Sequence, residues 1–80
     1  MDRSELLKSI NEVFITVFND KTINITENST AGDIKEWDSL NNIKLVVSVE
    51  KKLKIRFRAD EIRDWQKVGD MCDSILARFP

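Results

Sequence analysis

The chain has 80 residues, 41% of them apolar, so it is long enough for one small domain over residues 1–80 and too short for two. Thirteen basic and fourteen acidic side chains leave a formal net charge of −1, which gives no overall electrostatic reason to expect a nucleic-acid or membrane partner. A single cysteine, Cys72, and the absence of histidine exclude an internal disulfide, a Cys/His zinc site and a histidine-dependent catalytic triad.

Neither a targeting segment nor a membrane span is expected. Residues 1–5 are mostly charged and lead into no long apolar segment, and no run approaches the ~18 apolar residues of a membrane helix. We therefore expect a soluble, cytoplasmic protein that acts as a monomer.

The first predicted element is an amphipathic helix of about four turns, which Asp2 can cap at its N-terminus. Apolar residues recur every three or four positions, as on one face of a helix. They are Leu6, Leu7, Ile10, Val13, Phe14, Val17 and Phe18. We expect this face to be buried in the core.

Residues 19–36 form a long predicted loop. Asn, Asp, Thr, Ser and Gly dominate this stretch, and their side chains compete with the helical backbone for hydrogen bonds. Ile23, Ile25 and Ile34 are its only large apolar residues, so they are the candidate anchors.

Asp38 and Ser39 mark the start of a second helix, from Ser39 to about Leu53. A helix N-terminus carries unpaired N–H groups and a partial positive charge, so it suits a capping carboxylate at Asp38 and a phosphate attached nearby. The helix has a wide apolar belt, which predicts burial on several sides at the centre of the fold. The belt comprises Leu40, Ile43, Leu45, Val46, Val47 and Val49.

The remaining chain predicts two further helices. Residues 54–58 alternate polar and apolar side chains and read as an extended connector that buries Ile55 and Phe57. Residues 60–65 could form one or two helical turns, with Trp65 covering the core. The last helix is predicted from about Val68 to Phe79, so the whole pattern indicates an all-α bundle with a long first loop.

The stretch Trp37-Asp38-Ser39-Leu40 and the sequence after it resemble the acyl carrier protein family. The similarity continues through Ile55-Arg56-Phe57, Asp60-Glu61-Ile62 and Val68-Gly69-Asp70 to Ile75, and with the first helix it spans nearly the whole chain. It implies three longer helices and a short third one. Trp37 resembles the Trp-Asp-Ser-Leu form of carriers dedicated to small biosynthetic pathways.

The resemblance implies a role for Ser39 that needs no base within the chain. A separate phosphopantetheinyl transferase would attach phosphopantetheine from coenzyme A to Ser39, and the arm would carry acyl groups as thioesters between acyl-loading and acyl-transferring enzymes. The chain itself would then be no enzyme. Asp38 would cap the helix and help to orient the transferase's metal-bound substrate. From the local string alone, Ser39 could instead be a simple capping residue.

The family further implies a partner surface and a cleft that shelters the acyl chain. Partner contacts would come from Trp37, Leu40, Asn41 and Lys44, although Trp37 and Leu40 could equally be packing residues. The cleft candidates by matching position are Ile43, Val47, Val49, Phe57, Ile62, Trp65 and Val68, which could equally be ordinary core. The two bulky aromatic residues among them, Phe57 and Trp65, favour a short or polar acyl cargo.

The sequence departs from the family in the charge of its second helix, where a strongly acidic face is usual. Its polar residues are Asn41, Asn42, Lys44, Lys51 and Lys52, and Glu50 is the only acid after Asp38. Lys54 stands where a glycine often ends this helix in a left-handed conformation, and Lys67 stands at the expected cap of the last helix.

Two other functions remain open at this point. The chain could be a carrier-like interaction module that is never modified. It could also be a small helical nucleic-acid-binding domain, because Lys51, Lys52, Lys54, Arg56 and Arg58 lie close together.

Overall fold

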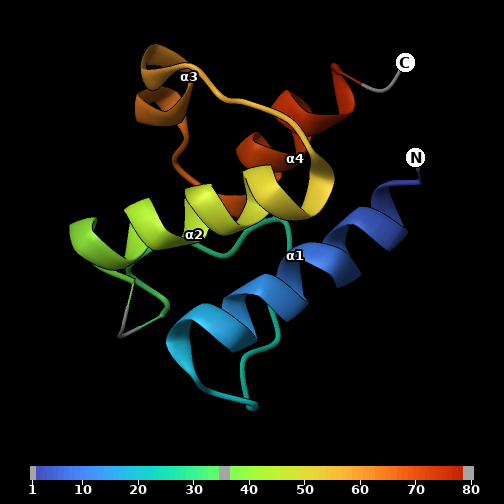
Figure 1. Ribbon diagram of the computed structural model, residues 1–80. Coiled ribbons are helices and arrows are strands. Elements are labelled where there is room, and N and C mark those ends of the chain that lie inside the picture. The colour runs from blue at the N-terminus through green and yellow to red at the C-terminus, as the bar shows by residue number, and fades with distance from the viewer. Residues whose placement is uncertain (1, 35–36, 79–80) are drawn as a thin grey trace.

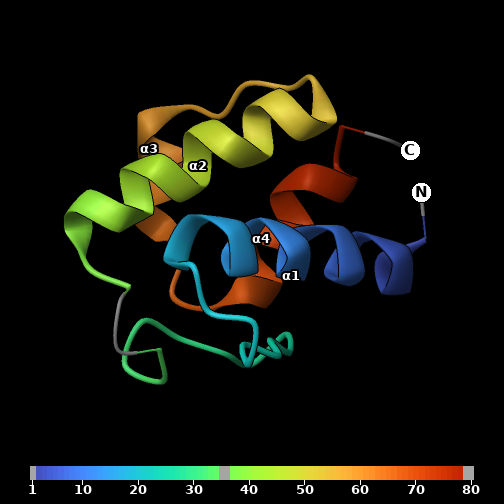
Figure 2. The same cartoon turned by 60° about the horizontal axis from the view of Figure 1, so that its bottom comes forward.

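The computed structural model describes residues 2–34 and 37–78. Within these ranges the chain forms four helices and no strand: α1 (Arg3–Phe18), α2 (Ser39–Leu53), α3 (Ala59–Asp64) and α4 (Val68–Leu76). Helix α2 packs along α1, α4 packs on α1, and the short α3 packs against α4 (Figures 1 and 2). The predicted all-α fold, with three longer helices, a short third helix and a long first loop, is confirmed.

Helix α1 supplies one wall of the core. The Asp2 carboxylate accepts a hydrogen bond from the Ser4 N–H (3.2 Å), and the helix ends at Asn19 in the left-handed conformation. The buried side chains of α1 are Leu6, Ile10, Val13, Phe14 and Phe18. The predicted cap is confirmed, and the predicted face packs on the core, with Leu7 and Val17 only partly buried at its edges.

The loop after α1 is attached to the core by its isoleucines. Ile25 is buried, and Ile23 and Ile34 pack partly buried against the same cluster. The N–H of Ile25 also donates to the side-chain oxygen of Asn11 on α1 (2.8 Å). The three residues therefore anchor the loop as the sequence predicts.

A second set of contacts joins this loop to α4. The N–H groups of Val68 and Gly69 donate to the carbonyl oxygens of Ser29 (2.9 Å) and Glu27 (2.8 Å). Because these are two of the N–H groups that open α4, the loop supplies the partners that a capping side chain would otherwise provide. The side chain of Lys67, at the cap position, makes no capping hydrogen bond.

Arg3 strengthens the same junction. Its guanidinium pairs with Glu27 of the loop (2.6 Å) and with Asp73 of α4 (2.9 Å), and it donates to the carbonyl oxygen of Gly69 (3.3 Å). The two carboxylates hold the pKa of Arg3 above its ordinary value.

Helix α2 differs from the prediction on one face. Leu45, Val46 and Val49 are buried, but Leu40 and Ile43 are 64% and 62% exposed and Val47 is 41% exposed. The prediction that the whole apolar belt is buried on several sides is therefore wrong. Only the side toward α1 and the core is covered, because α1 is the one described helix that packs along α2.

The C-terminal part follows the predicted order with one shorter helix. Ile55 and Phe57 pack partly buried on the core, and Trp65 meets Phe57 edge to face at a centroid distance of 4.8 Å. Helix α4 ends at Leu76, three residues before the predicted end, and Phe79 lies outside the described residues. None of the described helices combines the length and apolarity needed to cross a membrane.

Candidate functional site

The N-terminus of α2 presents Ser39 at the surface. The Asp38 carboxylate accepts a hydrogen bond from the Asn41 N–H (2.8 Å), which caps the helix as predicted. Ser39 follows as the first helical residue and is exposed. Its hydroxyl therefore stands at the positive end of the helix dipole, open to solvent.

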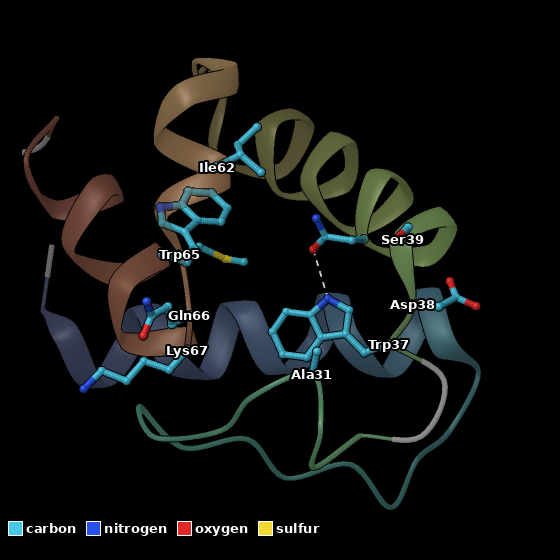
Figure 3. A pocket seen from close by; sticks show the side chains of 10 residues that line it. Ala31, Trp37, Asp38, Ser39, Ile62, Trp65, Gln66 and Lys67 are labelled. Carbon is cyan, nitrogen blue, oxygen red and sulfur yellow. Dashed lines mark hydrogen bonds between the residues drawn. The ribbon is translucent and has the colours of Figure 1, made fainter.

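A cavity of about 330 Å³ adjoins Ser39. Its walls come from the loop, the start of α2, α3 and the start of α4, and Figure 3 shows Trp37 and Trp65 on opposite sides of the opening. The lining residues are Ala31, Trp37, Asp38, Ser39, Asn42, Ile62, Trp65, Gln66, Lys67 and Met71.

Both tryptophan rings are held in place by hydrogen bonds of their indole N–H groups. The Trp37 Nε1–H donates to the side-chain oxygen of Asn42 (2.9 Å, dashed in Figure 3), and its ring meets Phe14 edge to face at 5.1 Å. The Trp65 Nε1–H donates to the Ser74 hydroxyl (2.9 Å). Both indoles therefore present apolar walls with their polar atoms already satisfied.

The electrostatics of the cavity favour a negative group near Ser39. The N-terminus of α2 lies at its rim, whereas Lys67, beside Gln66 on the opposite side, directs its amine away from the opening. Figure 3 shows the Asp38 carboxylate directed away from the opening. A phosphate on Ser39 would thus meet helix N–H groups without a carboxylate directed at it.

The acyl-cleft candidates separate into three groups. Ile62 and Trp65 line the cavity beside Ser39. Val49 and Val68 are buried in the core, and Phe57 is partly buried behind Trp65. Ile43 and Val47 are exposed on the outer face of α2.

The partner-surface candidates fall into two groups, those at the surface of α2 and Trp37, which packs inward. Leu40 and Lys44 are exposed on α2, and Asn41 is partly exposed beside them. Trp37 instead packs against Phe14 and the core, so its main contacts are internal.

Several cavity residues were not singled out as site residues by sequence reasoning. Asn42 was assigned to the polar face of α2, whereas its side chain accepts the Trp37 N–H inside the cavity; the five-residue spacing after Trp37 could have indicated this. Ala31, Gln66, Lys67 and Met71 reach the cavity only through the tertiary fold, and no sequence pattern points to them.

The basic residues near the end of α2 are partly neutralised. Lys52 pairs with Glu12 of α1 (2.9 Å), and Arg58 pairs with Asp60 (2.6 Å). This pairing removes two of the five cations of the nucleic-acid alternative, and the net charge of −1 gives no overall attraction to phosphates.

Cys72 lies in the core and belongs to no site. It is fully buried, and burial raises the pKa of its thiol to about 11. Such a thiol is a poor nucleophile and behaves as a small apolar side chain. Among the described residues, no group of three His, Cys, Asp or Glu side chains could hold a metal ion.

The chain is similar to acyl carrier proteins in sequence and in structure. It is 38% identical to the holo acyl carrier protein of Geobacter metallireducens, whose solution structure it matches with a TM-score of 0.82 over 91% of this chain and 87% of that one. It is 28% identical over 75 residues to the acyl carrier protein of Acidothermus cellulolyticus, covering 94% of this chain and 89% of the relative.

A further solved structure supports the fold alone. A Mycobacterium tuberculosis protein matches with a TM-score of 0.79 at 24% identity, over 90% of this chain and 96% of that one. No protein-family model matches the chain.

Proposed function

Because this chain belongs to the acyl carrier protein family, we propose that Ser39 carries a covalent phosphopantetheine arm that holds acyl groups as thioesters. The observation that carries the proposal is the position of Ser39, exposed at the capped N-terminus of α2 beside a cavity. The structural neighbour from Geobacter metallireducens is a holo protein, which supports a prosthetic group here.

The residues around Ser39 fit a phosphodiester. Its hydroxyl is accessible, and the helix N-terminus stabilises negative charge. A serine hydroxyl needs a base to act as a nucleophile, and the sequence contains no histidine. A separate transferase therefore supplies the base: the Ser39 oxygen forms the new bond to phosphorus, its proton goes to the transferase, and the nucleotide half of coenzyme A leaves.

When attached, the arm supplies a terminal thiol for thioester chemistry, and this chain's residues position it. Asp38 fixes the start of α2 through its cap and, by analogy with the family, contributes to transferase recognition. The cavity volume of about 330 Å³ lies at the lower end of small-molecule sites. We therefore propose a short acyl cargo between Trp37 and Trp65, served by biosynthetic enzymes that load and remove it.

Mass spectrometry tests the attachment directly. The purified protein is incubated with coenzyme A, magnesium and a broad-specificity phosphopantetheinyl transferase, and the intact mass is recorded. We expect the wild type to gain one phosphopantetheine and Ser39→Ala to gain none. Ser48→Ala, on the same helix, should be modified like the wild type.

The opposite outcome identifies the alternative. If a transferase that modifies a known carrier in the same buffer leaves this folded protein unchanged, the proposal is wrong and the chain is an unmodified carrier-like interaction module. Gain of mass in the Ser39→Ala variant would also contradict the assignment of the site.

A further inference from the structure

The outer side of α2 forms an uncovered face with apolar and basic side chains. We define the docking face as Leu40, Ile43, Lys44, Val47 and Lys51. These positions recur every three or four residues and so share one side of the helix. Leu40, Ile43 and Val47 are 64%, 62% and 41% exposed, and both lysines are exposed.

The lysines of this face are available to a partner. Within residues 2–34 and 37–78, neither Lys44 nor Lys51 makes an ion pair, whereas Lys52, on the adjoining side, is held by Glu12 (2.9 Å). The positive charges on the docking face are thus not neutralised by an ion pair within the described part of the chain.

The two acids of α2 and its cap are used internally. The Glu50 carboxylate accepts a hydrogen bond from the Phe57 N–H (2.8 Å), which directs it toward the connector after α2. The Asp38 carboxylate accepts from the Asn41 N–H. Neither acid makes an ion pair with Lys44 or Lys51.

A hollow extends the docking face at its C-terminal end. It has a volume of about 510 Å³ and is lined by Val47, Glu50, Lys51, Lys54, Ile55 and Arg56. Three basic residues and one acid, Glu50, thus surround the apolar surface at the end of the helix, which leaves a net positive lining. An apolar side chain could enter the hollow while acidic groups around it meet Lys51, Lys54 and Arg56.

We propose that the docking face binds enzymes that present an acidic surface around an apolar contact. The apolar residues supply the buried contact area, while the lysines select the sign of the partner's charge. This inference deepens the proposed function, because it specifies the partners that would receive the Ser39-bound acyl group. A partner with a basic docking patch is disfavoured by like-charge contact with Lys44 and Lys51.

Peptide binding to the unmodified protein tests the charge preference without requiring the arm. Two amphipathic helical peptides are used, with the same leucine face and either glutamate or lysine around it. We expect the glutamate peptide to bind about tenfold more tightly than the lysine peptide, and its affinity to fall as salt rises. When the glutamate peptide is added, the changes in the protein's backbone amide chemical shifts should concentrate at Leu40, Ile43, Lys44, Val47 and Lys51.

Matched charge variants then test which lysines cause the preference for the glutamate peptide. Lys44→Glu combined with Lys51→Glu should reverse the preference between the two peptides. Lys8→Glu combined with Lys21→Glu changes the net charge equally at exposed positions outside the docking face, and it should leave the preference intact. Leu40→Ser combined with Val47→Ser should weaken binding of the glutamate peptide by about tenfold at unchanged helix content.

Three results would overturn the proposal: equal affinity for both peptides, equal effects of the two double lysine variants, or shift changes outside the docking face. The mass test at Ser39 is independent of all three. A modified protein without charge preference would contradict only this inference, and a charge preference without modification would contradict only the carrier function.

Discussion

Gly69 shows how closely two segments approach at a single residue. A Cβ placed there would lie 2.9 Å from the carbonyl oxygen of Glu27, and the same oxygen accepts the Gly69 N–H (2.8 Å). The contact is with backbone that is itself hydrogen-bonded, so it cannot be relieved by rotating a side chain.

Gly69→Ala is therefore expected to destabilise the protein. Overpacking typically costs about 1–3 kcal/mol, whereas the gain in helix propensity is at most about 1 kcal/mol in a helix interior and smaller in the first turn. Thermal unfolding should show a lower midpoint. Gly32→Ala is the matched control, because its Cβ would lie 3.6 Å from the Thr30 hydroxyl in an exposed turn; an equal loss there would contradict the explanation.

Asp38 combines a capping role, seen in the structure, with a proposed recognition role. Asp38→Ala should lower the unfolding free energy by about 1 kcal/mol, while Asp38→Asn should retain the cap and most of the stability. Denaturant titrations measure this difference. If the carboxylate also orients the transferase's metal-bound substrate, the rate of phosphopantetheine attachment should fall in both variants; a normal rate in Asp38→Asn would refute the recognition role alone.

At the scale of the helices, the end of α2 contains a strained residue. Lys54 adopts a left-handed backbone with φ of 57°, and Asn19 ends α1 in the same conformation with φ of 53°. Side chains with a Cβ disfavour this region, and asparagine tolerates it better than lysine.

Lys54→Gly is therefore expected to raise the unfolding free energy by about 1 kcal/mol. Asn19→Gly should give a smaller gain, since asparagine already suits the position. Both are measured by urea denaturation at neutral pH. An equal gain in unfolding free energy for Asn19→Gly and Lys54→Gly would show that the ends of α1 and α2 do not differ in backbone strain.

The helices were predictable wherever local chemistry decides them. Asp38 before Ser39 located the start of α2. The left-handed residue that ends it, Lys54, was located instead by the family resemblance, in which a glycine often stands at this position. The end of α4 was predicted too late, because the apolar spacing continues past Leu76 while the helix does not.

The exposure of α2 could not be read from its apolar spacing. Leu40, Ile43 and Val47 have the periodicity of a buried face, and only the arrangement of the other helices decides which apolar residues are covered. The cavity beside Ser39 likewise depends on Ala31 and Met71, which come from distant segments and carry no sequence pattern of their own.

At the scale of the whole molecule, an ion pair joins the end of the chain to α3. The Arg78 guanidinium contacts both carboxylate oxygens of Glu61 (2.6 and 3.1 Å) and donates to the Ser74 carbonyl. This side-chain hydrogen bond holds the pKa of Glu61 below its ordinary value. The ionised carboxylate thus links α3 to the residues after α4.

The lowered pKa of Glu61 makes this link sensitive to acid. The resulting stabilisation is complete above the ordinary carboxyl pKa and is lost as the pH falls through the lowered one. Glu61→Gln should therefore unfold at a lower temperature than the wild type at pH 7, by an amount equivalent to about 1 kcal/mol, and the difference should shrink as the pH is lowered from 7 through the carboxyl range.

Asp64→Asn is the control for this prediction. Asp64 lies on the same helix and is exposed, and no salt bridge involves it in residues 2–34 and 37–78. The difference in unfolding temperature between Asp64→Asn and the wild type should be the same at pH 7 and at pH 3. A Glu61→Gln profile parallel to that of the wild type would contradict the role of the ion pair.

The two indoles beside Ser39 allow the cavity to be followed by intrinsic tryptophan fluorescence. Trp37 and Trp65 are the only tryptophans in the sequence, and both line the same cavity with their N–H groups fixed by Asn42 and Ser74. A group seated between the two rings would displace solvent from them, so intrinsic fluorescence can follow occupancy of the cavity in real time. In the single variants Trp37→Phe and Trp65→Phe one tryptophan remains, and a change in its emission would show whether a tethered acyl group touches that ring.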